Sequence, residues 1–263
     1  MKIKLFYNEE KDSTFIRNIL ESLLKKSNFK ITTSNSFDLG IAIGGDGTFL
    51  HMVMKSNFNS NALYVGINNG TLGFLQEIKP NEIKSFINNL THKKYKIEEL
   101  SYEEIIVKTK DKKVKFNSLN EVVVRDNNLK TAYFDVKIDD EVLEKFVGDG
   151  LMVSTPTGST SYNLSSGGAI IYNGLNVLEI TPLAPINNYI YRTLGNSVII
   201  PDTKVIKLIP NGRTTSVSVF IDGILHSFDS IEEIELKLSK NKIKVIRMNE
   251  YDYTKVIYNK FLK

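Results

Sequence analysis

The sequence of 263 residues contains no cysteine. This absence excludes a disulfide framework, a thiolate nucleophile and a cysteine zinc site, and it fits a reducing compartment. The three histidines, His51, His92 and His226, are scattered along the chain without the spacing of metal ligands. We therefore predict no metal-ligating residue.

Long apolar runs and strong charge are also missing. No stretch approaches the roughly 20 uninterrupted apolar residues of a membrane span, and the start, MKIKLFYNEEKD, turns acidic too early for a signal peptide. The net charge is only +4, and lysine is spread out rather than gathered in a basic stripe. We expect a cytoplasmic protein that binds neither membrane nor nucleic acid.

The length and an apolar content of 41% are sufficient for two domains with substantial cores. Up to residue 98, short apolar runs alternate with segments of helical spacing, which predicts βαβ units. The predicted strands are residues 2–7, 29–33, 39–43 and 63–67. The predicted helices begin behind a cap cluster at residues 12–14, near Thr48 and at Pro80. We predict a Rossmann-like α/β domain with a parallel sheet over residues 1–98.

After about residue 96 the helical period almost disappears, and β-rich runs follow one another between turn signals. The runs are residues 103–108, 121–125, 133–138, 151–154, 197–200, 205–209, 217–221 and 243–246. A short helix is predicted at residues 160–164. We predict a mostly-β domain, a β-sandwich, over residues 99–249, and a helical tail over residues 250–263 that packs against another part of the chain.

The segment LGIAIGGDGTFLH, residues 39–51, places a buried strand directly before Gly44, Gly45, Asp46 and Gly47. Ligands bind outside the carboxyl ends of such strands, and glycines there let backbone N–H groups approach a phosphate. A carboxylate beside phosphates is repelled unless it holds a metal ion or serves an attacking hydroxyl. The alternative is that Asp46 simply caps the following helix.

A second glycine cluster, NNGTLGF at residues 68–74, also follows a predicted strand. Two such loops at neighbouring strand ends would line one crevice, although a plain turn explains the second loop almost as well.

The densest polar stretch is FVGDGLMVSTPTGSTSYNLSSGG, residues 146–168. Asp149 lies between two glycines, as Asp46 does, and nine Ser, Thr and Tyr residues crowd the following turn. Hydroxyls at this density suit a polyhydroxylated or phosphorylated ligand, or they satisfy their own backbone. Outside this segment, Asn120 and Glu121 lie at the start of a predicted strand, and Asp222 with Gly223 predicts a hairpin turn. The sequence contains no Gly-x-Ser-x-Gly elbow of a serine hydrolase.

Together, residues 44–48, Asn120 with Glu121, and residues 148–168 resemble in order and spacing the signature motifs of the NAD kinases. The first motif alone is shared with lipid kinases and phosphofructokinases, but the third is specific. The segment LAPINNYIYRTL, residues 183–194, is similar to the shorter enzymes of low-GC Gram-positive bacteria.

The resemblance implies transfer of a phosphoryl group from ATP, another nucleotide or polyphosphate to the adenosine-ribose 2′-hydroxyl of NAD. It also implies a divalent ion such as Mg²⁺, a C-terminal tail (residues 250–263) that packs back on the first domain, and a homo-oligomer, a tetramer or a dimer. Asp46 matches the base that serves the hydroxyl, either by removing its proton or by orienting it. The positions that match NAD-binding residues are Asp46, Gly47, Phe74, Asn120, Glu121, Asp149, Thr160, Ser161, Tyr162, Ser165 and Ala184. Gly45 and Asp222 are assigned to a second nucleotide subsite.

The sequence departs from the family pattern at three positions. Ser161 stands where alanine is frequent, Gly223 stands where some relatives carry a larger residue, and Val147 stands where some carry Arg or Lys. Two other functions remain open: a lipid kinase of the diacylglycerol type, which would need an apolar groove or a basic membrane-facing patch, and a non-catalytic NAD-binding module, for which Asp46 would have little use.

Overall fold

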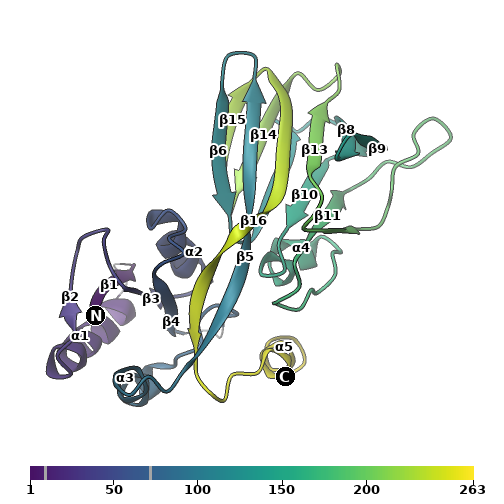
Figure 1. The fold of residues 1–263 in the computed structure, drawn as a ribbon. Helices are drawn as coiled ribbons and strands as arrows, with labels where there is room; N and C mark the ends of the chain where they lie inside the picture. The colour runs from purple at the N-terminus through teal and green to yellow at the C-terminus, as the bar shows by residue number, and fades with distance from the viewer. Residues whose placement is uncertain (9–10, 71–72) are drawn as a thin grey trace. The chain divides into compact units, whose positions relative to one another are not determined.

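The computed structural model describes residues 1–8, 11–70 and 73–263. By its internal contacts the chain forms two units, the first comprising Met1–Leu100 and Lys242–Lys263 and the second Ser101–Asn241. Two long strands, β5 (Lys96–Thr109) and β16 (Ile231–Arg247), contribute residues to both units. Figure 1 traces the elements of both units. Among the described residues, no helix is both long and apolar enough to cross a membrane.

The sheet of the first unit has the strand order β2-β1-β3-β4-β16, and every one of these pairs is parallel. Its other members are β1 (Lys2–Tyr7), β2 (Lys30–Ile31), β3 (Leu39–Gly44) and β4 (Leu63–Asn68). All residues of β3 are buried, as expected for a central parallel strand whose two faces are both covered. The predicted α/β domain with a parallel sheet is confirmed.

The helices of the first unit are α1 (Lys11–Lys26), α2 (Asp46–Lys55), α3 (Ile83–Thr91) behind the 3₁₀ turn η1 (Pro80–Glu82), and α5 (Tyr253–Phe261). α1 turns Ile16, Leu20 and Leu24 into the core. The predicted cap cluster at residues 12–14 is wrong, because these residues lie inside α1. Similarly, α2 begins at Asp46 rather than near Thr48.

The second unit contains two groups of antiparallel strands. One group comprises β5, β6 (Lys113–Ser118), β8 (Ala132–Ile138), β9 (Glu141–Gly148), β13 (Ile206–Pro210) and part of β16. The other has the order β12-β11-β10-β7-β14-β15. Its strands are β7 (Glu121–Asp126), β10 (Gly150–Ser154), β11 (Val177–Leu183), β12 (Val198–Pro201), β14 (Ser216–Ile221) and β15 (Ile224–Asp229).

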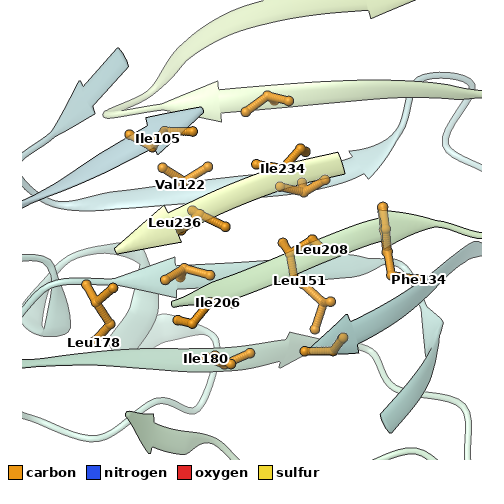
Figure 2. Close-up of a cluster of buried hydrophobic side chains, with 14 of the residues drawn as sticks. Ile105, Val122, Phe134, Leu151, Leu178, Ile180, Ile206, Leu208, Ile234 and Leu236 are labelled. Atoms are coloured by element: carbon orange, nitrogen blue, oxygen red, sulfur yellow. The ribbon is translucent and has the colours of Figure 1, made fainter. Parts of the chain in front are cut away.

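The core of the second unit lies between these two groups of strands. Ile105, Ile206 and Ile234 come from the first group and meet Val122 and Leu151 of the second (Figure 2). Apolar side chains therefore alternate inward from both sheets, which is the construction of a β-sandwich. The predicted mostly-β domain is confirmed.

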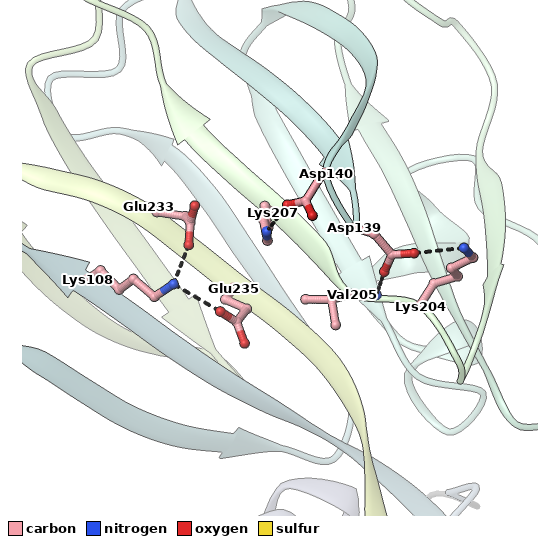
Figure 3. A network of polar contacts seen from close by, with 8 residues as sticks. All are labelled: Lys108, Asp139, Asp140, Lys204, Val205, Lys207, Glu233 and Glu235. Atoms are coloured by element: carbon pink, nitrogen blue, oxygen red, sulfur yellow. Dashed lines mark hydrogen bonds and ion pairs between the residues drawn. The ribbon is translucent and has the colours of Figure 1, made fainter.

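Polar contacts join neighbouring strands on the outside of this unit. Lys108 of β5 is paired with Glu233 and Glu235 of β16, and Lys204 is paired with Asp139 in the turn between β8 and β9 (Figure 3). These side chains are partly or largely exposed, so their ion pairs contribute little to stability. None of these residues is a predicted site residue.

Candidate functional site

The glycine corner that follows β3 uses its three glycines differently. Gly44 has φ +153°, and a Cβ there would lie 2.3 Å from Thr48 Oγ1, so the turn itself requires glycine. Gly45 is the N-cap of α2 in an extended conformation, and Gly47 lies in the first turn of the helix. Apart from the glycine itself, its chain neighbours and the backbone of the helix, no atom of the described residues comes within 4 Å of a Cβ built on Gly45 or Gly47. These two glycines leave open space at a helix N-terminus, where backbone N–H groups favour an anion.

Asp46 is held by the backbone of the second glycine cluster. Its Oδ2 accepts a hydrogen bond from Phe74 N and its Oδ1 one from Leu75 N, both at 2.9 Å. The carboxylate is partly exposed. Because Gly45 occupies the N-cap position and α2 has no side-chain cap bond, the alternative that Asp46 caps the helix is wrong.

The two glycine clusters of the sequence therefore meet at one carboxylate. A Cβ on Gly73 would lie 2.2 Å from Asp46 Oδ1, so only glycine permits this approach. Gln76 adds a bond from its Nε2 to Gly45 O at 2.7 Å. Residues 71 and 72 of the predicted loop lie outside the described residues. The sequence placed both loops at strand ends but could not show that one loop binds the other.

Phe74 packs against the C-terminal helix. Its ring centroid lies 6.2 Å from that of Tyr253 and 5.5 Å from that of Phe261. The ring, which the resemblance assigns to NAD binding, is thus in contact with α5.

In the second unit, Asp222 organises the backbone that carries Asn120 and Glu121. Its carboxylate accepts hydrogen bonds from Ser118 Oγ at 2.7 Å, Leu119 N at 2.9 Å and Asn120 N at 2.8 Å. Asp222 and Gly223, with φ +46° and +81°, form the two-residue turn between β14 and β15, which confirms the predicted hairpin. Nothing in the local sequence indicates that the turn carboxylate also anchors a distant loop.

Asn120 and Glu121 present buried acceptors that are not satisfied. Neither Asn120 Oδ1 nor Glu121 Oε2 has a hydrogen-bond partner in the part of the chain that the structure describes. Burial and the nearby Asp222 carboxylate raise the pKa of Glu121 to about 7, against a hydrogen bond from Ser161 that lowers it. Buried polar groups are normally hydrogen-bonded, so these two atoms are candidates for ligand contacts.

Burial and two neighbouring carboxylates also raise the pKa of Glu103 well above its ordinary range. Those neighbours are Asp222 and Glu121, so three acidic side chains influence one another here. Sequence reasoning missed Glu103, because nothing in its local pattern shows that the side chain is fully buried.

A cavity of about 280 Å³ opens beside Glu121 on the face formed by β7 and β14. It is lined by Glu121, Val123, Arg125, Tyr162, Phe220 and Gly223. Tyr162 is fixed at its margin by a bond from Arg125 Nη2 to the phenol oxygen at 2.8 Å. The apolar floor and the few polar groups are typical of a small-molecule site.

The hydroxyls of the dense polar segment divide into two sets. Those of Ser154, Thr155, Ser159 and Thr160 donate to main-chain carbonyls, so the alternative that hydroxyls satisfy the backbone is confirmed for these four. Ser161 bonds with Glu121, while Ser165 is exposed on the one-turn helix α4 (Tyr162–Ser165).

Below this turn lies a buried polar network that the sequence did not reveal. Asn163 Nδ2 donates to Glu179 Oε2 at 2.7 Å, and Thr181 Oγ1 donates to Asn163 Oδ1 at 2.6 Å. Glu179 also accepts from Ala169 N at 2.8 Å. These bonds hold the turn on β11.

Asp149 and Ala184 are brought together at the ends of their strands. Asp149 is exposed between β9 and β10, and its N–H donates to Leu183 O at 2.9 Å. The next residue, Ala184, is exposed with φ +43°. The two predicted residues therefore lie close together where β10 begins and β11 ends.

The predicted site residues thus fall into two groups. Gly45, Asp46, Gly47 and Phe74 belong to the first unit, and all the others belong to the second. Among the described residues, no cluster of three or more His, Asp or Glu side chains could hold a metal ion.

Comparison with known proteins places the chain in a family. The model of the ATP-NAD kinase N-terminal domain matches residues 4–95, and that of the ATP-NAD kinase C-terminal domain matches residues 119–248. The NAD kinase of Finegoldia magna is 38% identical over 99% of this chain and 97% of its own length. NAD kinase 2 of Bacillus subtilis is 31% identical over 99% and 97%. The chain belongs to the NAD kinase family.

Solved structures support the same fold. Yeast NADH kinase complexed with NADH superposes with a TM-score of 0.85 at 21% identity, covering 100% of this chain and 87% of that one. An NAD kinase from Archaeoglobus fulgidus in complex with ATP gives a TM-score of 0.78 at 21% identity, covering 99% and 98%.

Proposed function

We propose that this protein transfers a phosphoryl group from ATP to the adenosine-ribose 2′-hydroxyl of NAD, producing NADP. Family membership and the names of the relatives support this activity. The observation in the chain itself that carries the proposal is the Asp46 carboxylate. This carboxylate lies at the start of α2, where the main-chain N–H groups of Phe74 and Leu75 orient it. Two glycines with open space around them flank Asp46.

Asp46 serves the attacking hydroxyl in this proposal. Its Oδ atoms accept a hydrogen bond from the 2′-hydroxyl, which orients the oxygen for in-line attack and provides an acceptor for its proton. The open space at Gly45 and Gly47 lets phosphate groups approach the N-terminus of α2, as expected for a nucleotide subsite.

NAD is bound in this proposal by the second group of residues. Asn120 Oδ1 and Glu121 Oε2 are unsatisfied acceptors that suit amino and hydroxyl donors of a nucleoside. Tyr162 offers a ring beside the cavity next to Glu121. Asp149, Thr160, Ser161, Ser165 and Ala184 are further NAD-binding residues by resemblance, and Asp222 supports the backbone on which Asn120 and Glu121 lie.

A divalent ion such as Mg²⁺ accompanies the donor in this proposal. Mg²⁺ commonly binds through substrate phosphates with one or two carboxylates, and such an arrangement fits a chain whose described residues lack a three-ligand cluster. The ion supplies neutralisation of the charge on the transferring phosphoryl group.

A homotetramer, or a homodimer, is also proposed. In the segment that resembles the shorter bacterial enzymes, the adjacent Tyr189 and Ile190 are 92% and 63% exposed, and contiguous exposed apolar side chains are the kind of surface that a contact between copies would cover. Light scattering on the purified protein tests this assembly. The cytoplasmic location stays a prediction.

The activity is tested by incubating purified protein with NAD, Mg²⁺ and either ATP or polyphosphate, and by measuring NADP. We expect NADP from the unsubstituted protein. Asp46→Asn should lower turnover by orders of magnitude while NAD still binds, as measured by calorimetry. NAD binding without any NADP would instead support a non-catalytic NAD-binding module, and an Asp46→Asn variant that keeps most of its rate would remove the role given to this residue.

A further inference from the structure

The C-terminal segment, residues 247–263, contacts the loop that holds Asp46. This loop, residues 73–78, is called the connector here. It donates two main-chain hydrogen bonds to Asp46 and one side-chain bond to Gly45. Farther along, Asn68 N donates to Ile78 O at 2.8 Å, which ties the connector to β4.

The first contact of the C-terminal segment is with Glu77 of the connector. Met248 N donates to Glu77 Oε1 at 2.7 Å. Arg247, only 2% exposed, lies with Nη1 3.7 Å from Glu77 Oε2 and with Nε 2.7 Å from Glu98 Oε2. Its guanidinium also lies 4.1 Å from the centroid of the Tyr251 ring. A buried arginine with these partners determines where the chain leaves β16.

The second contact is with Phe74. Tyr253 and Phe261 are eight residues apart on α5, so they lie on one face of the helix, and both rings meet the ring of Phe74. Asp252 caps α5 by accepting hydrogen bonds from Thr254 N and Lys255 N. None of the residues of α5, all of which are described, is buried, so the helix lies at the surface of its unit.

We propose that Tyr253 and Phe261 are positioning residues for Asp46. They act through Phe74: packing of its ring fixes the backbone N–H groups of Phe74 and Leu75, and these orient the carboxylate of Asp46. The C-terminal segment contacts the connector at two residues, Phe74 and Glu77. These residues lie on either side of Gln76, whose side chain donates a hydrogen bond to Gly45 O. This inference rests on the proposed role of Asp46 in phosphoryl transfer.

The main test compares Phe261→Ala with Tyr258→Ala. Tyr258 lies on the same helix with 56% of its surface exposed, so its removal controls for general effects on α5. Loss of carboxylate orientation should lower kcat of Phe261→Ala by about 10-fold to 100-fold, whereas Tyr258→Ala should stay within about twofold of the unsubstituted protein. Tyr253→Ala should resemble Phe261→Ala, and Tyr253→Phe should restore the rate because the ring remains.

A second measurement separates positioning from general destabilisation. Both alanine substitutions are repeated in the Asp46→Asn background under single-turnover conditions with excess protein. If Phe261 acts through Asp46, Phe261→Ala should add less than about twofold there, because coupled residues are not additive. An equal loss in both backgrounds, or equal rates for Phe261→Ala and Tyr258→Ala, would overturn the proposal.

NADP formation by the unsubstituted protein separates failure of the proposed function from failure of the positioning role. If the unsubstituted protein forms no NADP, the proposed function is wrong. If it forms NADP and Phe261→Ala matches its control, only the positioning role is wrong. Should Phe261→Ala not fold, judged by circular dichroism, Phe261→Leu keeps an apolar contact but loses the ring and is measured in its place.

Discussion

The carboxylate of Asp222 is hydrogen-bonded to the main-chain N–H of Asn120, at 2.8 Å, although the two residues are 102 positions apart. The same carboxylate accepts from Ser118 Oγ and Leu119 N. A two-residue hairpin turn therefore determines the backbone of the loop whose side chains carry unsatisfied acceptors.

Asp222→Asn should weaken both stability and NAD binding. An amide retains one acceptor and places a donor against the surrounding donors, so we expect a loss of about 1–3 kcal/mol in the free energy of unfolding. The Michaelis constant for NAD should rise because Asn120 and Glu121 lose their fixed backbone. Urea denaturation and steady-state kinetics measure the two effects. Asp202→Asn, in an exposed turn, is the control, and equal behaviour of both variants would contradict the anchoring role.

Gly47→Ala should separate ligand approach from folding. Alanine is preferred over glycine in a helix by up to about 1 kcal/mol, and an added Cβ meets no described atom within 4 Å outside its chain neighbours and the backbone of the helix. The melting temperature should therefore hold or rise, while kcat/KM falls because the Cβ occupies space that a phosphate needs. Gly44→Ala should instead lower the melting temperature, because alanine is strained at φ +153° and its Cβ would contact Thr48. Unchanged kcat/KM in Gly47→Ala would show that no phosphate approaches this glycine.

Gly73→Ala should displace the carboxylate of Asp46. The new Cβ would lie 2.2 Å from Oδ1, so either the carboxylate or the connector must move. A shift of about 1 Å in a reacting group costs on the order of 100-fold in rate, and we expect a loss of this size in kcat. Gly70→Ala is the matched control, since no described atom beyond its chain neighbours lies within 4 Å of a Cβ at this position. Comparable kcat values for the two variants would show that the close approach is unimportant for turnover.

Glu121→Gln should reduce the dependence of stability on pH. The pKa of Glu121 rises from its ordinary 4.5 to about 7 in the folded chain, so between these values the folded state binds more protons than the unfolded state. The free energy of unfolding should then fall as pH rises from about 4.5 to about 7, by up to about 1.4 kcal/mol per pH unit for this group. Urea denaturation at pH 5 and pH 7 measures the slope. Glu77 and Glu103 contribute in the same direction, so the slope should decrease in Glu121→Gln without vanishing, and an unchanged slope would contradict the prediction.

Part of the fold was predictable because its determinants are local. The apolar run of β3 followed by glycines predicted a strand and a turn, and Asp222 with Gly223 predicted a hairpin that the structure contains. β11 escaped prediction because Glu179 and Pro182 interrupt its apolar pattern. Glu179 is tolerated there only because Asn163 and Ala169 donate to it.

Resemblance to the NAD kinase motifs named the candidate site residues, and the sequence alone determined the alternation of elements in the first unit and the β-rich second unit. These properties depend on neighbouring residues and on periodicity, which a single chain displays directly. Only the tertiary structure decided that Phe74 and Leu75 hold Asp46, that Asp222 holds Asn120, and that α5 packs on Phe74. Each of these contacts joins residues far apart in the chain, and short-range pattern does not encode which distant N–H or ring a side chain meets once the chain is packed.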